Sequence, residues 1–335
     1  MGKNSIKKRF AKDIGLPIPV YEEPYWSFFL NLYEKEYWAK SIWTDFQKGL
    51  QEEYDNNPDL FLTDYSKVRD TMIDNIKGHP RYKDFNEGDM KKWDLGNLNI
   101  REKNIYNHEF SGKTFISVDL KKANIQAMMR YNIITGEGYL DNIYHDWITS
   151  AIGEGKKLLS WYIPSSKYIR QAIFGNCNPK RQMTIERFLV YTAGKIVESE
   201  LSQLGLQPVI AQLGNDEVVF EITIPEDVTL TKDMFNFISD RIISEENIIV
   251  RVSPFKLIEN NFISKSEILL RTYEKRSLLD NSRILKGVPK PFHSQVYEIL
   301  NNIPFPEGDE DLVFVTETDE LARFVHRLKL THDFD

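Results

Sequence analysis

VIAQLGNDEVVFEI, the sequence of residues 209–222, is the most informative stretch of the chain. An apolar run enters a short turn at Gly214 and Asn215, and a second apolar run follows Asp216 and Glu217. This pattern predicts a β-hairpin that carries an acidic pair at its tip. Two carboxylates at a hairpin tip are suited to holding a divalent cation, but acidic residues are also common in solvated turns. The pair alone leaves both interpretations open.

A second carboxylate follows another β-rich run, earlier in the chain. Residues 114–118 read TFISV, Asp119 comes next, and residues 120–129 have helical character. On neighbouring strands, Asp119 and Asp216 would clamp a pair of Mg²⁺ ions for phosphoryl transfer. Magnesium suits this arrangement because it needs few protein oxygens and takes its other ligands from water and phosphates. We therefore expect Mg²⁺, or Mn²⁺, at Asp119 and Asp216.

A third segment, SKYIRQAIFG at residues 166–175, has helical spacing. Arg170 and Phe174 are four residues apart and share one face of the predicted helix, and Lys167 lies next to that face. Such cations can grip a triphosphate, and the aromatic ring can stack on a base. An ordinary amphipathic helix, with Phe174 in the core and Arg170 in solvent, explains the same pattern.

The hairpin and the strand ending at Asp119 resemble motifs C and A of the A-family (Pol I-like) DNA polymerases and their single-subunit relatives. Asp119 matches the metal-binding aspartate of motif A, and Asp216 and Glu217 match the acidic pair of motif C. Asn215 stands where the family usually has His. The resemblance implies an α+β fold with a polymerase-like palm, which is an antiparallel sheet backed by helices. It implies a catalytic role for the three carboxylates, with Glu217 the weaker or indirect metal ligand.

The helical segment resembles motif B of the same family. Arg170, Phe174 and Gly175 match its phosphate-gripping cation, base-stacking aromatic and following glycine, with Arg in place of the usual Lys. Asn178 and Gln182 have the spacing of the family's Asn and Gln, which face the minor groove of the primer-template. The resemblance therefore implies that these five residues bind substrate.

The chain departs from the family pattern at several positions. Phe174 and Gly175 are followed almost at once by Asn178, so the fingers are short. The first cation of the fingers helix is replaced, and Lys167 is its nearest substitute in the substrate site. Asn124 stands where the family's DNA polymerases have a glutamate that helps to exclude the ribose 2′-hydroxyl. We expect Asn124 to contact substrate, and the choice between DNA and RNA stays open.

Composition bounds the class of protein. The 335 residues are 41% hydrophobic and carry a net charge of −7, which is not the strongly basic balance of a protein that coats nucleic acid. A lone cysteine, Cys177, is typical of a reducing compartment. No run reaches the roughly 18 apolar residues of a membrane span. We expect a cytoplasmic protein that does not interact with membranes.

The pattern along the chain predicts three parts. Residues 1–109 are helical and rich in aromatic residues, and the resemblance implies a thumb-like region. Residues 110–273 form the predicted palm with abbreviated fingers and include an amphipathic helix at residues 183–204. Residues 274–335 differ in character and are predicted to be a C-terminal appendage.

Our leading hypothesis is a template-directed or primase-like nucleotidyltransferase, a DNA or RNA polymerase that uses two-metal phosphoryl transfer from nucleoside triphosphates. Its partner would be nucleic acid, either a primer-template or a single-stranded template. A second protein that completes the fingers or clamp is a further hypothesis. One alternative is a catalytically silent polymerase relative that acts as a nucleic-acid-binding accessory subunit. Another is an unrelated phosphohydrolase or nuclease that uses the same carboxylates.

Overall fold

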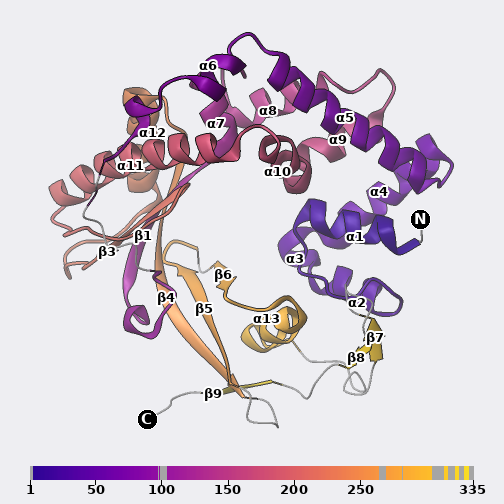
Figure 1. The fold of residues 1–335 in the computed structure, drawn as a ribbon. Helices are drawn as coiled ribbons and strands as arrows, with labels where there is room; N and C mark the ends of the chain where they lie inside the picture. The colour runs from indigo at the N-terminus through magenta and orange to yellow at the C-terminus, as the bar shows by residue number, and fades with distance from the viewer. Residues whose placement is uncertain are drawn as a thin grey trace.

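The chain folds around one seven-stranded antiparallel sheet (Figure 1). The computed structural model describes residues 3–96, 98, 104–263, 269–280, 282–303, 313–315, 321–323 and 328–331. The strand order is β2 (Val209–Leu213), β3 (Glu217–Ile222), β1 (Thr114–Leu120), β4 (Val250–Ile263), β5 (Leu269–Ser277) and β6 (Arg283–Lys286), and β9 (Lys329–Thr331) pairs with the far end of β4. A separate hairpin pairs β7 (Val313–Val315) with β8 (Leu321–Arg323). The predicted α+β class and the antiparallel sheet are confirmed.

The two strands that carry the predicted carboxylates are neighbours. Strands β2 and β3 form the predicted hairpin, and β3 pairs directly with β1. In this register Asp119 lies opposite Glu217, and Val118 lies opposite Val218. The hairpin tip therefore lies at the end of β1 where the predicted motif A aspartate is found.

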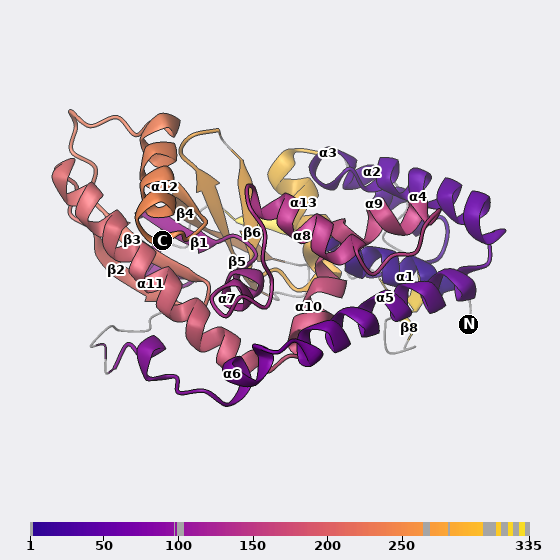
Figure 2. The same cartoon turned by 90° about the horizontal axis from the view of Figure 1, so that it is seen from above.

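Helices cover one face of the sheet (Figure 2). The helices on this side are α7 (Ala123–Met129), α11 (Pro179–Gln203) and α12 (Lys232–Glu246). Helix α11 packs on β1 and β3, α12 packs on β4, and α7 lies against α11. Gly194 lets α11 approach the sheet closely, because a Cβ atom there would lie 2.9 Å from Cγ1 of Val218. The apolar core between these helices and the sheet thus positions α11 against β1 and β3.

The opposite face of the sheet is apolar at one end and charged at the other. Side chains alternate along each strand, so every second residue shares a face. Phe115 and Phe255 stack at the apolar end, with ring centroids 5.5 Å apart. Asp119, Glu217 and Arg251 lie on the same face at the other end. The charged end of this face contains the two residues predicted at the ends of β1 and the hairpin, Asp119 and Glu217.

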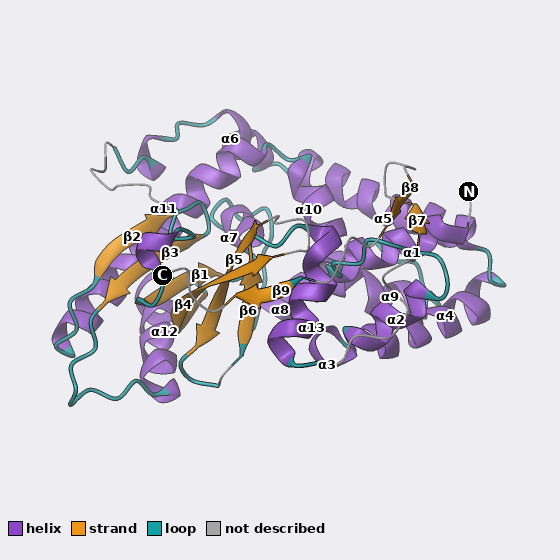
Figure 3. Cartoon of the chain, turned by 90° about the horizontal axis from the view of Figure 1, so that it is seen from below, coloured by secondary structure: helices purple, strands orange, loops and turns teal. Residues whose placement is uncertain are grey.

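The first part of the chain is helical and lies to one side of the sheet (Figure 3). Its helices are α1 (Lys3–Ile14), α2 (Tyr25–Leu32), α3 (Glu34–Tyr37), α4 (Ala39–Tyr54), α5 (Pro58–Gly78) and α6 (Tyr82–Glu87). They form one layer with α8 (Leu140–Thr149), α9 (Lys157–Ser165) and α10 (Lys167–Gly175), since α1 and α5 pack on α10 and α4 packs on α9. Trp26, Phe29 and Phe46 are buried in this layer, as their helical spacing predicts. Within the described ranges, no helix combines the length and the apolar character needed to cross a membrane.

A buried carboxylate joins the N-terminal helices to the start of α10. Asp13 is fully buried and accepts hydrogen bonds from the hydroxyls of Tyr65 (2.7 Å), Tyr162 (2.8 Å) and Ser166 (2.7 Å). Ser166 also caps α10, because its Oγ accepts a hydrogen bond from Ile169 N at 3.0 Å. The N-terminal region thereby fixes where α10 begins and which way its first residues face.

The structure corrects the predicted boundaries. The boundary between residues 273 and 274 falls inside β5, and β6 extends the same sheet, so both strands belong to the sheet and not to an appendage. The boundary between 109 and 110 falls inside a short 3-10 helix, His108–Phe110. Helix α13 (His293–Asn301) then returns to the N-terminal helices, where His293 Nδ1 lies 2.9 Å from Tyr33 Oη. Residues 304–312, 316–320, 324–327 and 332–335 of the predicted appendage lie outside the described residues.

Candidate functional site

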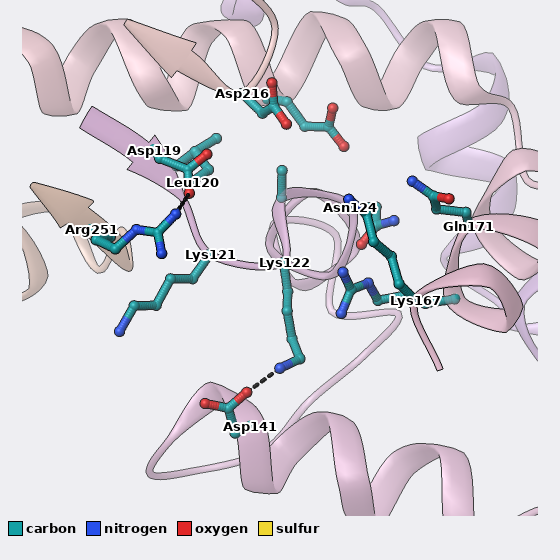
Figure 4. Close-up of a pocket in the computed structure, with 13 residues that line it drawn as sticks. Asp119, Leu120, Lys121, Lys122, Asn124, Asp141, Lys167, Gln171, Asp216 and Arg251 are labelled. Atoms are coloured by element: carbon teal, nitrogen blue, oxygen red, sulfur yellow. Dashed lines mark hydrogen bonds and ion pairs between the residues drawn. The ribbon is translucent and has the colours of Figure 1, made fainter. Parts of the chain in front are cut away.

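The end of β1 and the hairpin tip bring two aspartates to one cavity. Leu120 N donates a hydrogen bond to Asp216 O at 2.8 Å, which fixes the tip beside Asp119. Gly214 N donates to Glu217 O at 2.8 Å and closes the turn, so Asp216 is left exposed at its tip. Asp119 and Asp216 line the same cavity, whose volume is about 480 Å³ (Figure 4). The predicted pair of aspartates is therefore brought together.

Asp119 is paired with an arginine. Arg251 lies directly opposite it on β4, and Arg251 Nη2 donates to Asp119 Oδ2 at 3.2 Å (Figure 4). Burial raises the pKa of Asp119, Arg251 lowers it, and the nearby charges of Glu217 and Asp216 raise it again, so that the pKa stays above its ordinary value. Because Asp119, Asp216 and Glu217 repel one another, a positive charge placed beside them would stabilise their ionised forms.

Glu217 is held by the sheet. Its Oε1 accepts hydrogen bonds from Ser117 Oγ at 2.5 Å and from Lys275 Nζ at 2.6 Å. Burial opposes the ionised form, but the Lys275 ammonium and these hydrogen bonds outweigh burial and keep the pKa of Glu217 below its ordinary value. Glu217 is thus an ionised carboxylate with its charge already compensated.

Helix α10 supplies cations across the cavity from the aspartates. Lys167, Arg170 and Gln171 line the same cavity as Asp119. The Arg170 guanidinium lies 5.9 Å from the ring centroid of Tyr144, which supports its side chain. The Ser166 cap directs the first turn of α10 toward the cavity, so the predicted cations Lys167 and Arg170 do face it.

Residues at the start of α7 complete the cavity wall. Lys121 and Asn124 line it, and so does Lys122, whose ammonium pairs with Asp141 (Figure 4). The Oδ1 atom of Asn124 is buried without a hydrogen-bond partner in the described part of the chain. Asn124 therefore lies in the site, as the sequence predicts.

A second cavity, of about 670 Å³, adjoins the first over the charged face of the sheet. The two cavities share Lys167, Asp119, Asp216 and Arg251. Strands β5 and β6 and the start of α12 contribute three more lysines, Lys275, Lys286 and Lys232. The aspartates thus lie at the junction of two cavities that both carry positive charge.

Phe174 and Gly175 lie elsewhere than the resemblance implies. Phe174 is only 2% exposed and stacks on Trp147, with ring centroids 5.6 Å apart. Gly175 is the last residue of α10, and neither residue lines the cavity with Asp119. In this structure the Phe174 ring is packed in the core and has no open face for a base, which corrects its predicted role.

The side chains of Asn178 and Gln182 make hydrogen bonds within the protein. Asn178 caps α11, since its side chain accepts from Arg181 N, and its amide donates to Asn86 Oδ1 at 2.9 Å. Gln182 is buried, and its Nε2 donates to Phe174 O and Cys177 O, both at 2.7 Å. Both residues hold the α10–α11 junction and do not line the cavity with Asp119. Helix α11 accordingly begins at Pro179, earlier than the predicted start at 183.

Sequence reasoning missed an acidic residue of the cavity, Glu186. It lies on α11 one turn after Gln182, on the side that packs against the sheet, and it is 9% exposed. Burial, and then the charge of Asp216, raise the pKa of Glu186 to about 7. The available signal was a carboxylate within the apolar stripe of an amphipathic helix. Arg251 and Lys275 were missed because only strand pairing places them beside the carboxylates.

The donor set suits a hard cation. Within the described residues, no group of three or more His, Cys, Asp or Glu side chains is arranged to hold a metal ion. Two aspartates in an open cavity match the smaller set that Mg²⁺ uses, because one or two carboxylates suffice when water and phosphates supply the rest. Asp119 and Asp216 therefore fit Mg²⁺ chemically.

No protein-family model, curated protein or solved structure matches the chain.

Proposed function

We propose that the protein is a nucleotidyltransferase that joins nucleotides from nucleoside triphosphates, in the manner of a polymerase or primase with a palm and very short fingers. One observation carries the proposal. Asp119 and Asp216, from neighbouring strands, share a cavity with Lys167 and Arg170 of α10. Carboxylates on one wall and cations on the other are what a triphosphate with its Mg²⁺ requires.

The residues divide the work by charge. Asp119 and Asp216 would hold Mg²⁺, which supplies charge neutralisation for an in-line displacement at the α-phosphate. Lys167 and Arg170 bind the triphosphate and offset the negative charge that develops on the pyrophosphate as it leaves. Glu217, whose charge is met by Lys275, holds β3 against Ser117 of β1 and Lys275 of β5.

The adjoining cavity suits the strand that is extended. It runs over the sheet from the aspartates toward Lys275 and Lys286, and Lys232 faces it from α12. Phosphate groups of a nucleic acid bind to such lysines without regard to sequence. A hydroxyl at the end of that strand would then meet the α-phosphate at the junction of the two cavities.

One observation favours the silent accessory subunit instead. Arg251 pairs with Asp119 and Lys275 pairs with Glu217, so protein cations already compensate two of the acidic residues. A relative that has given up metal binding would benefit from such pairs. Arg251 is 61% exposed, however, and an exposed side chain can turn away at small cost when a divalent cation competes for the aspartate.

Nucleotide incorporation tests the proposal. The purified chain is supplied with Mg²⁺ or Mn²⁺ and with labelled ribonucleotides or deoxyribonucleotides, on single-stranded, primed and absent templates. Incorporation that requires a divalent cation supports the proposal, and the preferred sugar shows what Asn124 permits. Binding of nucleic acid without incorporation under any of these conditions would favour the accessory subunit.

A further inference from the structure

Glu186 is a buried acidic residue of the cavity for which the proposed chemistry has no role so far. It is 9% exposed, and what remains exposed lines the cavity that contains Asp119 and Asp216. Its neighbours along the sheet-facing stripe of α11 are apolar, as Val190 and Ala193 illustrate. A carboxylate in such surroundings costs free energy unless something compensates its charge.

The other acidic residues at the cavities have partners, and Asp280 in the second cavity accepts hydrogen bonds from Ser282 N and Oγ. Arg251 pairs with Asp119, and Lys122 pairs with Asp141. Lys275 does the same for Glu217.

Two carboxylates remain after this pairing. Across the residues that the structure describes, the side chains of Glu186 and Asp216 have neither an ion pair nor a hydrogen bond. Both side chains line the cavity that contains Asp119. The cavity thus has an unmet demand for positive charge at one place, between α11 and the hairpin tip.

We infer that Glu186 and Asp216 together hold a divalent cation, at a position distinct from the pairing of Asp119 with Arg251. The ligand class follows from the donors, since two carboxylates with room for water suit Mg²⁺ or Mn²⁺. Asp216 then serves two neighbouring cation positions, one shared with Asp119 and one with Glu186.

The inference deepens the proposed function and rests on it for the purpose of the cation, which would help to bind the triphosphate that Lys167 and Arg170 face. The existence of the site does not depend on catalysis. A measurement of metal binding without nucleotide therefore tests the site separately.

The test is Mn²⁺ binding to the full chain without nucleotide. Binding is monitored through the electron paramagnetic resonance signal of free Mn²⁺. Wild type is compared with E186Q, with E186D, and with E198Q as a matched control on the exposed side of the same helix. We expect E186Q to lower Mn²⁺ affinity by at least tenfold, E186D to lower it less, and E198Q to leave it unchanged.

Equal Mn²⁺ affinity in wild type and E186Q would overturn the inference, as would the absence of Mn²⁺ binding by wild type. Circular dichroism in EDTA checks the fold of each variant, and E186D carries the test if E186Q does not fold. Loss of affinity in E186Q without nucleotide incorporation by wild type would uphold the site and reject the proposed function. Nucleotide incorporation by wild type, together with unchanged Mn²⁺ affinity in E186Q, would support the proposed function and reject the cation site at Glu186.

Discussion

Asp119 on β1 and Arg251 on β4 lie directly opposite each other, and Arg251 Nη2 donates a hydrogen bond to Asp119 Oδ2 at 3.2 Å. The backbone pairing fixes Asp119, whereas the Arg251 side chain is 61% exposed and free to turn. Under the proposed function, Arg251 and a divalent cation would compete for the carboxylate of Asp119. This competition makes Arg251 a direct probe of metal binding by Asp119.

Replacing Arg251 by alanine should strengthen metal binding. We expect R251A to bind Mn²⁺ about two- to fivefold more tightly, because an exposed ion pair is worth only about 0.5–1 kcal/mol. Arg251 also lowers the pKa of Asp119, so its removal should move the acid limb of Mn²⁺ binding to higher pH. The measurement is Mn²⁺ affinity as a function of pH, with R251K as the charge-preserving control. Weaker Mn²⁺ binding by R251A, with no movement of the acid limb, would contradict the account.

Removing a cation from α10 should weaken nucleotide binding. We expect K167A and R170A each to lower the affinity for a fluorescent nucleoside triphosphate about ten- to a hundredfold, since charge-assisted hydrogen bonds contribute about 1.5–3 kcal/mol. Binding is measured by titration, with Mn²⁺ affinity followed in parallel and expected to hold. The control is K195A, which removes an exposed lysine of α11 that pairs with Glu198. Nucleotide affinity equal to that of wild type in both α10 variants would show that the triphosphate does not bind in this cavity.

Phe174 should matter for stability and not for nucleotide affinity. Its ring is 2% exposed against Trp147, so F174A should lower the free energy of unfolding by about 3–5 kcal/mol. The milder F174L should stay folded and bind nucleotide as wild type does. Urea denaturation measures the first effect and nucleotide titration the second. A stable F174L with affinity reduced tenfold or more would restore the base-stacking role implied by the resemblance.

Glu186 should make stability depend on pH in the absence of metal. Its pKa is raised to about 7, first by burial and then by Asp216, above the value of about 4.3 expected in the unfolded chain. The folded state therefore binds this proton more tightly, and stability falls as pH rises from about 4.3 through 7.

Between pH 5 and pH 8, the loss of stability attributable to Glu186 is about 2.5 kcal/mol. Urea denaturation in EDTA at pH 5 and pH 8 measures this loss of stability. E186Q should not show the loss, whereas E198Q should show it as wild type does. Added Mg²⁺ should restore stability to wild type at pH 8, because a ligand of the folded state stabilises that state. The same pH dependence in wild type and E186Q would show that Glu186 is not buried as described.

The local elements were predictable because their signals are local. Alternating apolar residues and a Gly-Asn turn give the β2–β3 hairpin, and the TFISV run gives β1. Five residues that the sequence singled out line one cavity: Asp119, Asp216, Lys167, Arg170 and Asn124. The pairing of β1 with β3, and the start of α10 near their ends, bring these residues together.

The remaining features depend on packing that no short stretch encodes. Arg251 and Lys275 reach the carboxylates only through the pairing of β4 and β5 with the central strands. Glu186 lies within the apolar stripe of α11, but only the packing of α11 on the sheet places it in the cavity with Asp216. Gln182 matches a substrate-binding pattern by its spacing, but the tight connection from α10 to α11 occupies its amide with two backbone carbonyls. Identical spacing thus serves packing in one fold and substrate binding in another.

Metal-dependent nucleotide incorporation by D119N and D216N tests the central claim most directly. Each change keeps the size of the side chain and removes one carboxylate charge, and D240N supplies an exposed control on α12. We predict that wild type and D240N incorporate nucleotide at equal rates with Mg²⁺ or Mn²⁺, and that D119N and D216N, folded as judged by circular dichroism, fall at least a hundredfold. Wild-type rates in either aspartate variant would contradict the account.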